Sequence, residues 1–471
     1  MPAQDATSLA LAIRRRETSA SAVMAATLTR IDERAELGAV CHLDKELAHR
    51  AAAHHDALVA SRSRRAQTPF SGVPFLMKDL GNAAAGLPPG AGSTALRSRQ
   101  LRQPADSMLA KRFRKAGLLP FGLTTTPEFG LSLASEPAGG PIARNPDDFG
   151  RTPGGSSGGA AAAVAAGLVA IAHATDAAGS IRVPAACCGL LGLKPTRGAT
   201  PNGPSFGNHL MGLVGELVVA RSVRDVQAAF DCCTGLSEGP FPDPDFDVFE
   251  RDGEPLRIGI LDHSGFAIGA EQLAAVESVA QTFIDAGNKI VPVRPSVLDH
   301  LARRAAGLAR LVVSVSMAEW LDWLAIRDDE ISPLAAAVAE EGRNVSATRL
   351  FATDRDGAIL THELWRVFDN VDVIVTPMLA NTPPPIGSFP TDHSDVTIQF
   401  DRMQSFAPYA ALANVSGFPA LSIPHGRDSL GLALSAQLIG PMSGDKMLLD
   451  LAKILERDAP WKYSCDIAGH P

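Results

Sequence analysis

Two short runs of glycine and serine are the residues of this chain best suited to carry chemistry. The first is Gly-Gly-Ser-Ser-Gly-Gly over 154–159, and the second is Ala-Gly-Ser over 178–180. Small residues let the backbone approach a ligand closely, and backbone N–H groups in such turns point at anionic atoms. A serine hydroxyl in such a turn becomes a nucleophile when a base activates it. The two runs therefore indicate a site for an anionic atom or for a reactive serine.

Other interpretations of the first run fit less well. A flexible linker is disfavoured because Pro153 precedes the run and an alanine-rich helical pattern follows it. A nucleotide site would need G-x-x-x-x-G-K-[ST], or G-x-G-x-x-G after a strand, and the chain has neither. Residues 154–158 match the G-x-S-x-G nucleophile elbow of α/β-hydrolases, but the residues before them have a loop pattern where that motif needs a strand.

The elements that must position these runs alternate between strand and helix patterns. Short apolar runs predict strands at 72–78, 118–123, 169–173, 256–261, 289–293, 371–377, 419–424 and 432–440. Helical spacing is found over 7–35, 45–60, 159–166, 223–232, 271–286, 298–370 and 444–456. This alternation predicts an α/β fold, with a β-α-β unit at 256–293.

Composition and charge exclude several classes of protein. The chain has 471 residues, a net charge of −8 and no dense basic face, which disfavours a nucleic-acid partner. No apolar run is long enough to cross a membrane, and the first residues lack a signal-peptide pattern. The six cysteines show neither a zinc pattern nor a disulfide framework, and we expect Cys187 and Cys188 in a buried turn without a nucleophilic role. These features predict a cytoplasmic protein.

Four segments in a fixed order carry a more specific signal. They are GVPFLMKD (72–79), TPGGSSGG (152–159), TDAAGSIRVPA (175–185) and CGLLGLKPTRG (188–198). Together they resemble the amidase signature family, and further matching segments extend the resemblance to about residue 440. The Asp-Ala-Ala-Gly-Ser run is similar to the subgroup that includes hydrolases of the 6-aminohexanoate cyclic dimer. The resemblance implies the amidase signature fold, in which helices flank one large mixed β-sheet.

The resemblance also implies a catalytic triad. In the family pattern Ser180 is the nucleophile, Ser156 is a bridging serine that follows a cis peptide bond, and Lys78 is the base. An ordinary lysine, with a pKa of about 10.4, is charged at neutral pH and cannot accept a proton. Burial of Lys78 would lower its pKa and leave it neutral. We therefore expect Lys78 to be buried and to face Ser156.

Further roles follow from the same resemblance. The backbone N–H groups of Ala177, Ala178 and Gly179, with that of Ser180, are expected to bind the oxyanion. Ser157, Asp176 and Arg182 are expected to support the two loops. The predicted lining of the substrate pocket is Thr125, Phe129, Leu131, Leu210 and Met211. Segments 123–126 and 205–214 depart from the family pattern, so the identity of the substrate does not carry over.

The resemblance predicts one amidase domain over residues 1–471. Within it we expect a signature core at about 68–205, a surface loop at 236–255, a peripheral βα and helical region at 256–370, and a return to the central sheet at 371–456. The expected reaction is hydrolysis of the C–N bond of a small-molecule amide through a Ser180 acyl-enzyme. Carbamates, esters and cyclic amide oligomers stay open as substrates.

One alternative function shares all these motifs. The glutaminase (A-type) subunit of a tRNA-dependent amidotransferase has the same signature, but it would need a partner chain and tRNA. The apolar character of the predicted pocket and the lack of a basic face disfavour it. We expect no cofactor, no metal, no nucleic acid and no membrane partner, and a homodimer is left open.

Overall fold

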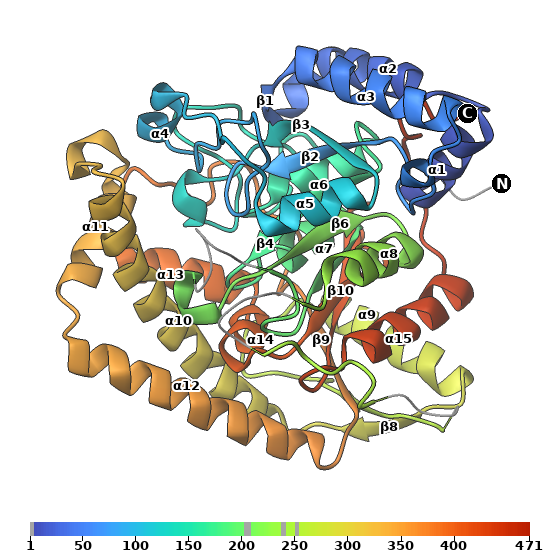
Figure 1. The fold of residues 1–471 in the computed structure, drawn as a ribbon. Helices are drawn as coiled ribbons and strands as arrows, with labels where there is room; N and C mark the ends of the chain where they lie inside the picture. The colour runs from blue at the N-terminus through green and yellow to red at the C-terminus, as the bar shows by residue number, and fades with distance from the viewer. Residues whose placement is uncertain (1–3, 202–208, 237–241, 250–253) are drawn as a thin grey trace.

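A mixed sheet of eleven strands forms the centre of the described structure (Figure 1). This computed structural model describes residues 4–201, 209–236, 242–249 and 254–471. Across the sheet the strand order is β1-β3-β2-β4-β6-β5-β10-β11-β9-β7-β8. The strands are β1 (Val40–Leu43), β2 (Val73–Lys78), β3 (Leu118–Thr124), β4 (Ile171–Asp176), β5 (Leu191–Lys194), β6 (Gly215–Ala220), β7 (Arg257–Ile260), β8 (Lys289–Pro292), β9 (Val373–Pro377), β10 (Ala420–Arg427) and β11 (Ala433–Ile439).

The pairing of strands brings the predicted site residues to one edge of the sheet. β2 runs parallel to both β3 and β4, so Lys78 and Asp176 end their strands on the same side. β4 and β5 both pair with β6 in antiparallel fashion, and β10 pairs with β5. The strands near the end of the chain therefore join through β5 and β6 to β4, which leads into the second glycine–serine run. The predicted β-α-β unit is confirmed, because β7 and β8 are parallel and α9 connects them.

Helices cover the sheet on both faces (Figure 1). They are α1 (Ala6–Arg15), α2 (Ala20–Glu33), α3 (Lys45–Ala60), α4 (Thr94–Arg99), α5 (Met108–Lys115), α6 (Gly158–Ala165), α7 (Arg182–Cys187), α8 (Val223–Cys233), α9 (Ala270–Asp285), α10 (Pro295–Trp323), α11 (Pro333–Arg343), α12 (Ala347–Phe368), α13 (Val396–Phe406), α14 (Ala410–Ser416) and α15 (Asp445–Asp458). Helices α11, α12 and α14 all pack against the long α10. The predicted α/β class and large mixed sheet are confirmed.

The structure divides two predicted helical stretches and corrects one further prediction. The helical pattern over 7–35 is two helices, because Arg16 adopts a left-handed φ of 60° and ends α1. The pattern over 298–370 contains three helices, because Pro333 and the N-cap Ser346 begin new ones. Cys187 is the last residue of α7 and does not lie in a turn, since packing of α7 against β5, β10 and β11 stabilises this short helix.

Parts of two predicted segments lie outside the described residues. Of the loop predicted at 236–255, the structure describes 236, 242–249, 254 and 255, and none of these belongs to a helix or strand. Residues 202–208 are likewise outside the description, which leaves 209–214 of the segment without a family pattern. Within the described ranges, every helix is too short or too polar to cross a bilayer.

Candidate active site

Lys78 is the last residue of β2, and its side chain is buried with 1% exposure. Every residue of β2 is buried, so the strand carries the amine into the interior. The Lys78 Nζ atom lies 2.7 Å from Ser156 Oγ and 2.7 Å from Thr175 Oγ1. The expected burial is therefore found, and the amine faces two hydroxyl groups.

Burial lowers the pKa of Lys78 to about 7, because a charged ammonium loses its hydration there. The negative charges of Glu216 and Asp176 act in the opposite direction and raise this pKa. A lysine with such a pKa is partly neutral at neutral pH. It can then accept a proton from a neighbouring hydroxyl, which an ordinary lysine cannot do.

Ser156 lies in a tightly enclosed turn before α6. The Gly155–Ser156 peptide bond is cis, as the resemblance implied. The Ser156 carbonyl accepts hydrogen bonds from the hydroxyls of Thr126 at 2.8 Å and Ser135 at 3.2 Å. A Cβ atom at Gly155 would lie 2.6 Å from the Ala134 nitrogen, so a larger residue would not fit. These contacts fix the backbone that presents the Ser156 hydroxyl to Lys78.

The two glycine–serine runs are joined to each other through Ser157. Its backbone N–H donates to the Ser180 carbonyl at 3.3 Å. Its hydroxyl donates to the Thr175 carbonyl at 3.2 Å and accepts from the Thr175 N–H at 3.3 Å. Ser157 thus connects the Ser156 turn both to β4 and to the turn of Ser180, which lines the same cavity as Ser156.

Asp176 organises the turn that carries Ser180. Its carboxylate accepts from the N–H of Gly179 at 2.7 Å and from that of Ile181 at 3.1 Å. The Gly179 N–H is therefore occupied, which corrects its predicted role in binding the oxyanion. The N–H groups of Ala177, Ala178 and Ser180 have no acceptor within the described part of the chain. These three groups are the candidates for stabilising an oxyanion.

Arg182 pairs with Asp176 in a fully buried network. Two guanidinium nitrogens of Arg182 each lie 2.9 Å from the Asp176 carboxylate. Burial would raise the pKa of Asp176, but Arg182 and the hydrogen bonds from Asn414 and Gly179 outweigh it and hold that pKa well below its usual range. Arg182 also donates to Asn414 and to Gln437, each at 2.6 Å. Strand β11 and helix α14 thereby support the serine turn.

A cavity with two lobes opens at Ser180. The smaller lobe, of about 70 Å³, contains Ser156 and Thr175 and is otherwise lined mainly by apolar side chains from the turns around it and from α10. The larger lobe, of about 220 Å³, lies between α10 and α13 and does not reach Ser156. Its polar lining includes Arg303 and Gln404. The lobes share Gly130, Leu131, Ala177, Ser180 and Val313.

The structure brings some predicted pocket residues to this cavity and leaves others away from it. Phe129 and Leu210 line the smaller lobe, and Leu131 lines both. Thr125 lines neither lobe, because it is fully buried and its hydroxyl donates to the Gly38 carbonyl at 2.6 Å. Met211 also lines neither lobe and packs on a separate apolar cluster that includes residues of α10 and α14.

Several residues at the site were missed in the sequence. Val313, Met317 and Trp320 of α10 line the smaller lobe. Their i, i+4, i+7 spacing places them on one apolar face of the helix, which the sequence shows. The sequence does not show that this face lines the cavity. Thr175 lies within a family segment, yet only the geometry shows its contact with Lys78.

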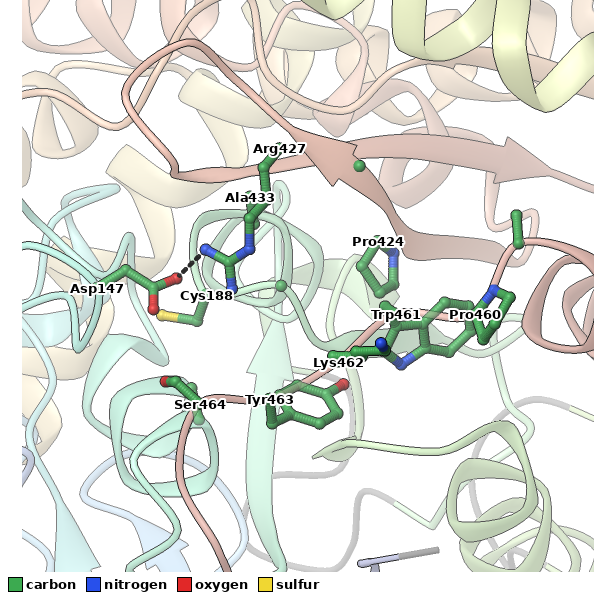
Figure 2. A pocket seen from close by; sticks show the side chains of 14 residues that line it. Asp147, Cys188, Pro424, Arg427, Ala433, Pro460, Trp461, Lys462, Tyr463 and Ser464 are labelled. Atoms are coloured by element: carbon green, nitrogen blue, oxygen red, sulfur yellow. Dashed lines mark hydrogen bonds and ion pairs between the residues drawn. The ribbon is translucent and has the colours of Figure 1, made fainter. Parts of the chain in front are cut away.

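A separate cavity of about 210 Å³ lies beside Cys188 (Figure 2). Figure 2 shows the ion pair between Asp147 and Arg427, 3.0 Å apart, next to this cysteine. Burial raises the pKa of Cys188 well above that of an ordinary thiol, so it is not a thiolate nucleophile. Among the described residues, no three His, Cys, Asp or Glu side chains are grouped to hold a metal ion.

Comparison with known proteins gives the same family as the sequence segments. The amidase family model matches residues 22–449. The 6-aminohexanoate-cyclic-dimer hydrolase of Pseudomonas sp. (strain NK87) is 31% identical, over 97% of this chain and 95% of that protein. The enzyme of the same name from Paenarthrobacter ureafaciens is also 31% identical, with the same shares covered.

This chain belongs to the amidase signature family. It is an amidase, a hydrolase of amide C–N bonds. A solved structure of 6-aminohexanoate cyclic dimer hydrolase superposes with a TM-score of 0.89 at 29% identity, covering 98% of each chain. A bacterial aryl acylamidase of the family superposes with a TM-score of 0.84 at 23% identity, covering 96% of each chain, which shows the shared fold.

Proposed function

We propose that this amidase hydrolyses a small-molecule amide through an acyl-enzyme on Ser180, with Ser156 and Lys78 as the proton relay. The observation that carries the proposal is the 2.7 Å contact between Lys78 Nζ and Ser156 Oγ, with Ser156 and Ser180 in one cavity. The lowered pKa of Lys78, about 7, supports its role as a base.

The relay accounts for every proton. Neutral Lys78 takes the proton of Ser156, and Ser156 takes that of Ser180 as Ser180 Oγ attacks the amide carbonyl carbon. The N–H groups of Ala177, Ala178 and Ser180 stabilise the negative oxygen that forms. Ser156 then donates a proton to the leaving nitrogen, takes one back from Lys78, and the C–N bond breaks. Water repeats the sequence on the ester and releases the acid.

The two lobes orient the substrate in this proposal. Because Ser156 protonates the leaving nitrogen, the amine half belongs in the smaller lobe, which contains Ser156. The acyl half then extends into the larger lobe. The mainly apolar smaller lobe favours an uncharged, apolar amine half. Carbamates, esters and cyclic amide oligomers remain candidates, since the similar hydrolases are named for a cyclic dimer.

The similar proteins favour this function over a glutaminase subunit, since two of them are named as hydrolases of a cyclic amide dimer. We also propose that residues 1–471 act as one catalytic domain. The contacts of Arg182 with Asn414 and Gln437 support this, because they tie the serine turn to the last third of the chain.

Covalent labelling tests the proposed function. The purified protein is treated with a fluorophosphonate, digested, and its peptides are analysed by mass spectrometry. The expected adduct is on Ser180, it is absent in Ser180→Ala, and wild type hydrolyses at least one member of a panel of aryl and alkyl amides. An adduct on another residue, or turnover that persists in Ser180→Ala, would refute the proposal.

A further inference from the structure

A second buried network lies next to Lys78 and is not part of the proposed relay. Glu216 of β6 and His173 of β4 are both fully buried, and His173 Nε2 lies 2.8 Å from the Glu216 carboxylate. Glu216 also accepts from the backbone N–H of Asn82 at 3.0 Å and from its side-chain amide at 2.8 Å. Since each of these partners can donate and none of the Asn82 groups can accept, Glu216 binds them as a carboxylate.

The orientation of His173 follows from its other ring nitrogen. His173 Nδ1 accepts the backbone N–H of Lys78 at 3.3 Å, so this nitrogen carries no proton. The proton is then on Nε2, where it is donated to Glu216, and the ring is neutral. Phe113 packs edge-on against the imidazole, with 5.6 Å between ring centroids. His173 thus links the carboxylate of Glu216 to the backbone of Lys78.

The same carboxylate lies close to the residues around the Lys78 amine. Glu216 is the direct partner of Thr175 in the antiparallel pair of β4 and β6, and the Thr175 hydroxyl contacts Lys78 Nζ. At Gly81, with φ of +108°, a Cβ atom would lie 2.6 Å from Thr175 Cγ2 and 2.7 Å from Glu216 Oε2. Only glycine lets the loop after β2 approach this closely.

We propose that Glu216 is a positioning residue of this amidase. Through His173 and Asn82 its carboxylate fixes both ends of the segment that carries Lys78 and Leu80, and its charge sets how readily Lys78 takes up a proton. Leu80 lines the smaller lobe, so the same contacts also hold part of the cavity wall. This inference rests on the proposed function, in which Lys78 is the base.

The charges around Lys78 single out Glu216. Burial lowers the pKa of Lys78, and the negative charge of Glu216 opposes this effect more strongly than that of Asp176. Asp176 is paired with Arg182. Glu216 has no arginine or lysine partner in the described ranges. Lys194 of the neighbouring strand β5 lies beside Gly215. Burial lowers the pKa of Lys194 to about 7.

The variant Glu216→Gln removes the charge and keeps the size of the side chain. Protonated Lys78 then loses a stabilising negative charge, so Lys78 stays neutral down to a lower pH. The midpoint of the acid limb of kcat/KM is expected to fall by about one pH unit. The plateau also falls, because a glutamine amide has one acceptor oxygen where the carboxylate has two, so it cannot accept from both His173 and the Asn82 side chain. A merely structural role would lower the plateau and leave the midpoint in place.

Three further variants serve as controls for the charge. Glu216→Asp keeps the carboxylate, and its midpoint is expected close to that of wild type. His173→Gln also keeps the carboxylate, so its midpoint stays at or above the wild-type value while its plateau falls. Asp5→Asn removes a buried carboxylate before α1 that binds Ser222 and Arg224, and its midpoint is expected to be unchanged.

An unmoved or raised midpoint in Glu216→Gln would overturn the role of Glu216. A midpoint that falls by one pH unit in His173→Gln would overturn it as well. This second variant tests the role of Glu216 even when Glu216→Gln fails to fold. Fluorophosphonate labelling of the wild type separates this inference from the proposed function. Absence of Ser180 labelling in the wild type refutes the proposed function itself. Normal labelling of the wild type, together with an unmoved midpoint in Glu216→Gln, refutes only the positioning role.

Discussion

Two buried lysines on the same sheet differ in what their amines contact. Burial lowers the pKa of both Lys78 on β2 and Lys194 on β5 to about 7. The Lys78 amine faces the hydroxyls of Ser156 and Thr175, whereas Lys194 Nζ donates to the carbonyl of Pro195 at 2.7 Å. A hydroxyl can pass on a proton and a peptide carbonyl cannot. A lowered lysine pKa therefore does not by itself identify a base.

The cavity marks the second difference between the two lysines. The hydroxyl that Lys78 contacts belongs to Ser156, which lines the smaller lobe. Lys194 lines neither lobe and lies among the charges of Arg182, Asp176 and Asp445. Only at Lys78 can a proton travel from the amine to a bound substrate. We expect the two lysines to act alike on stability and differently on catalysis.

Replacing each lysine by methionine gives the largest expected contrast. Lys78→Met removes the base, so kcat/KM for an amide substrate is expected to fall by about 10³-fold. Lys194→Met is expected to lower it by less than about tenfold, since Lys194 contacts no reacting group. Steady-state kinetics measures both, and circular dichroism checks that each variant is folded. Equal losses in the two variants would show that the comparison is wrong.

Stability against pH is expected to respond to both lysines in the same way. Each is neutral when folded and charged when unfolded between about pH 7 and its ordinary pKa of 10.5. The unfolded chain binds more protons in this window, so the free energy of unfolding rises with pH from 7 to 10.5 and levels off below 7. Either methionine variant flattens this rise, which urea unfolding at several pH values measures. A slope unchanged in both variants would contradict the lowered pKa values.

Thr175→Val tests the second hydroxyl at the Lys78 amine. Valine keeps the shape and removes one of the two contacts of Nζ, so kcat/KM is expected to fall by about 30-fold with little change in KM. The matched control is Thr196→Val on the Lys194 side, whose hydroxyl binds Asp445. This control should leave kcat/KM nearly unchanged. A larger loss of kcat/KM in Thr196→Val than in Thr175→Val would contradict the account, because it would place the catalytically important hydroxyl beside Lys194.

The smallest expected effect concerns the two lobes. Met317→Ala enlarges the smaller lobe and is expected to favour bulky amine halves by about tenfold in relative kcat/KM. Met403→Ala enlarges the larger lobe and should instead favour bulky acyl halves. A substrate panel that varies one half at a time measures both preferences. Preferences exchanged between the two variants would reverse the proposed orientation of the substrate.

The sequence was informative where function depends on residue type in a fixed segment. The α/β class, the large sheet and the family could be predicted, because several segments match in order and the strand patterns are strong. Lys78, Ser156 and Ser180 came from this resemblance, and the structure places the first two in contact. Periodicity could not show where a helix ends, as at Arg16, because a single left-handed residue decides it.

The remaining features depend on contacts between distant segments. The capture of the Gly179 N–H by Asp176 is a detail of turn geometry that residue types do not specify. Glu216 lies 138 positions after Lys78 and meets its surroundings only through the pairing of β4 and β6. Thr125 was expected at the pocket because it belongs to segment 123–126, which departs from the family pattern, but its hydroxyl binds Gly38. Each of these needed the folded geometry.

The pH dependence of Ser180 labelling tests most directly whether Lys78 activates this serine. The rate of reaction with a fluorophosphonate is measured from pH 5 to pH 9 in wild type, Lys78→Met and Lys194→Met. In wild type and Lys194→Met the rate should rise with a midpoint near pH 7, as the pKa of Lys78 requires. In Lys78→Met the rate should fall by at least about 10²-fold and lose this inflection. Labelling of Lys78→Met at the wild-type rate, with the inflection retained, would contradict the account.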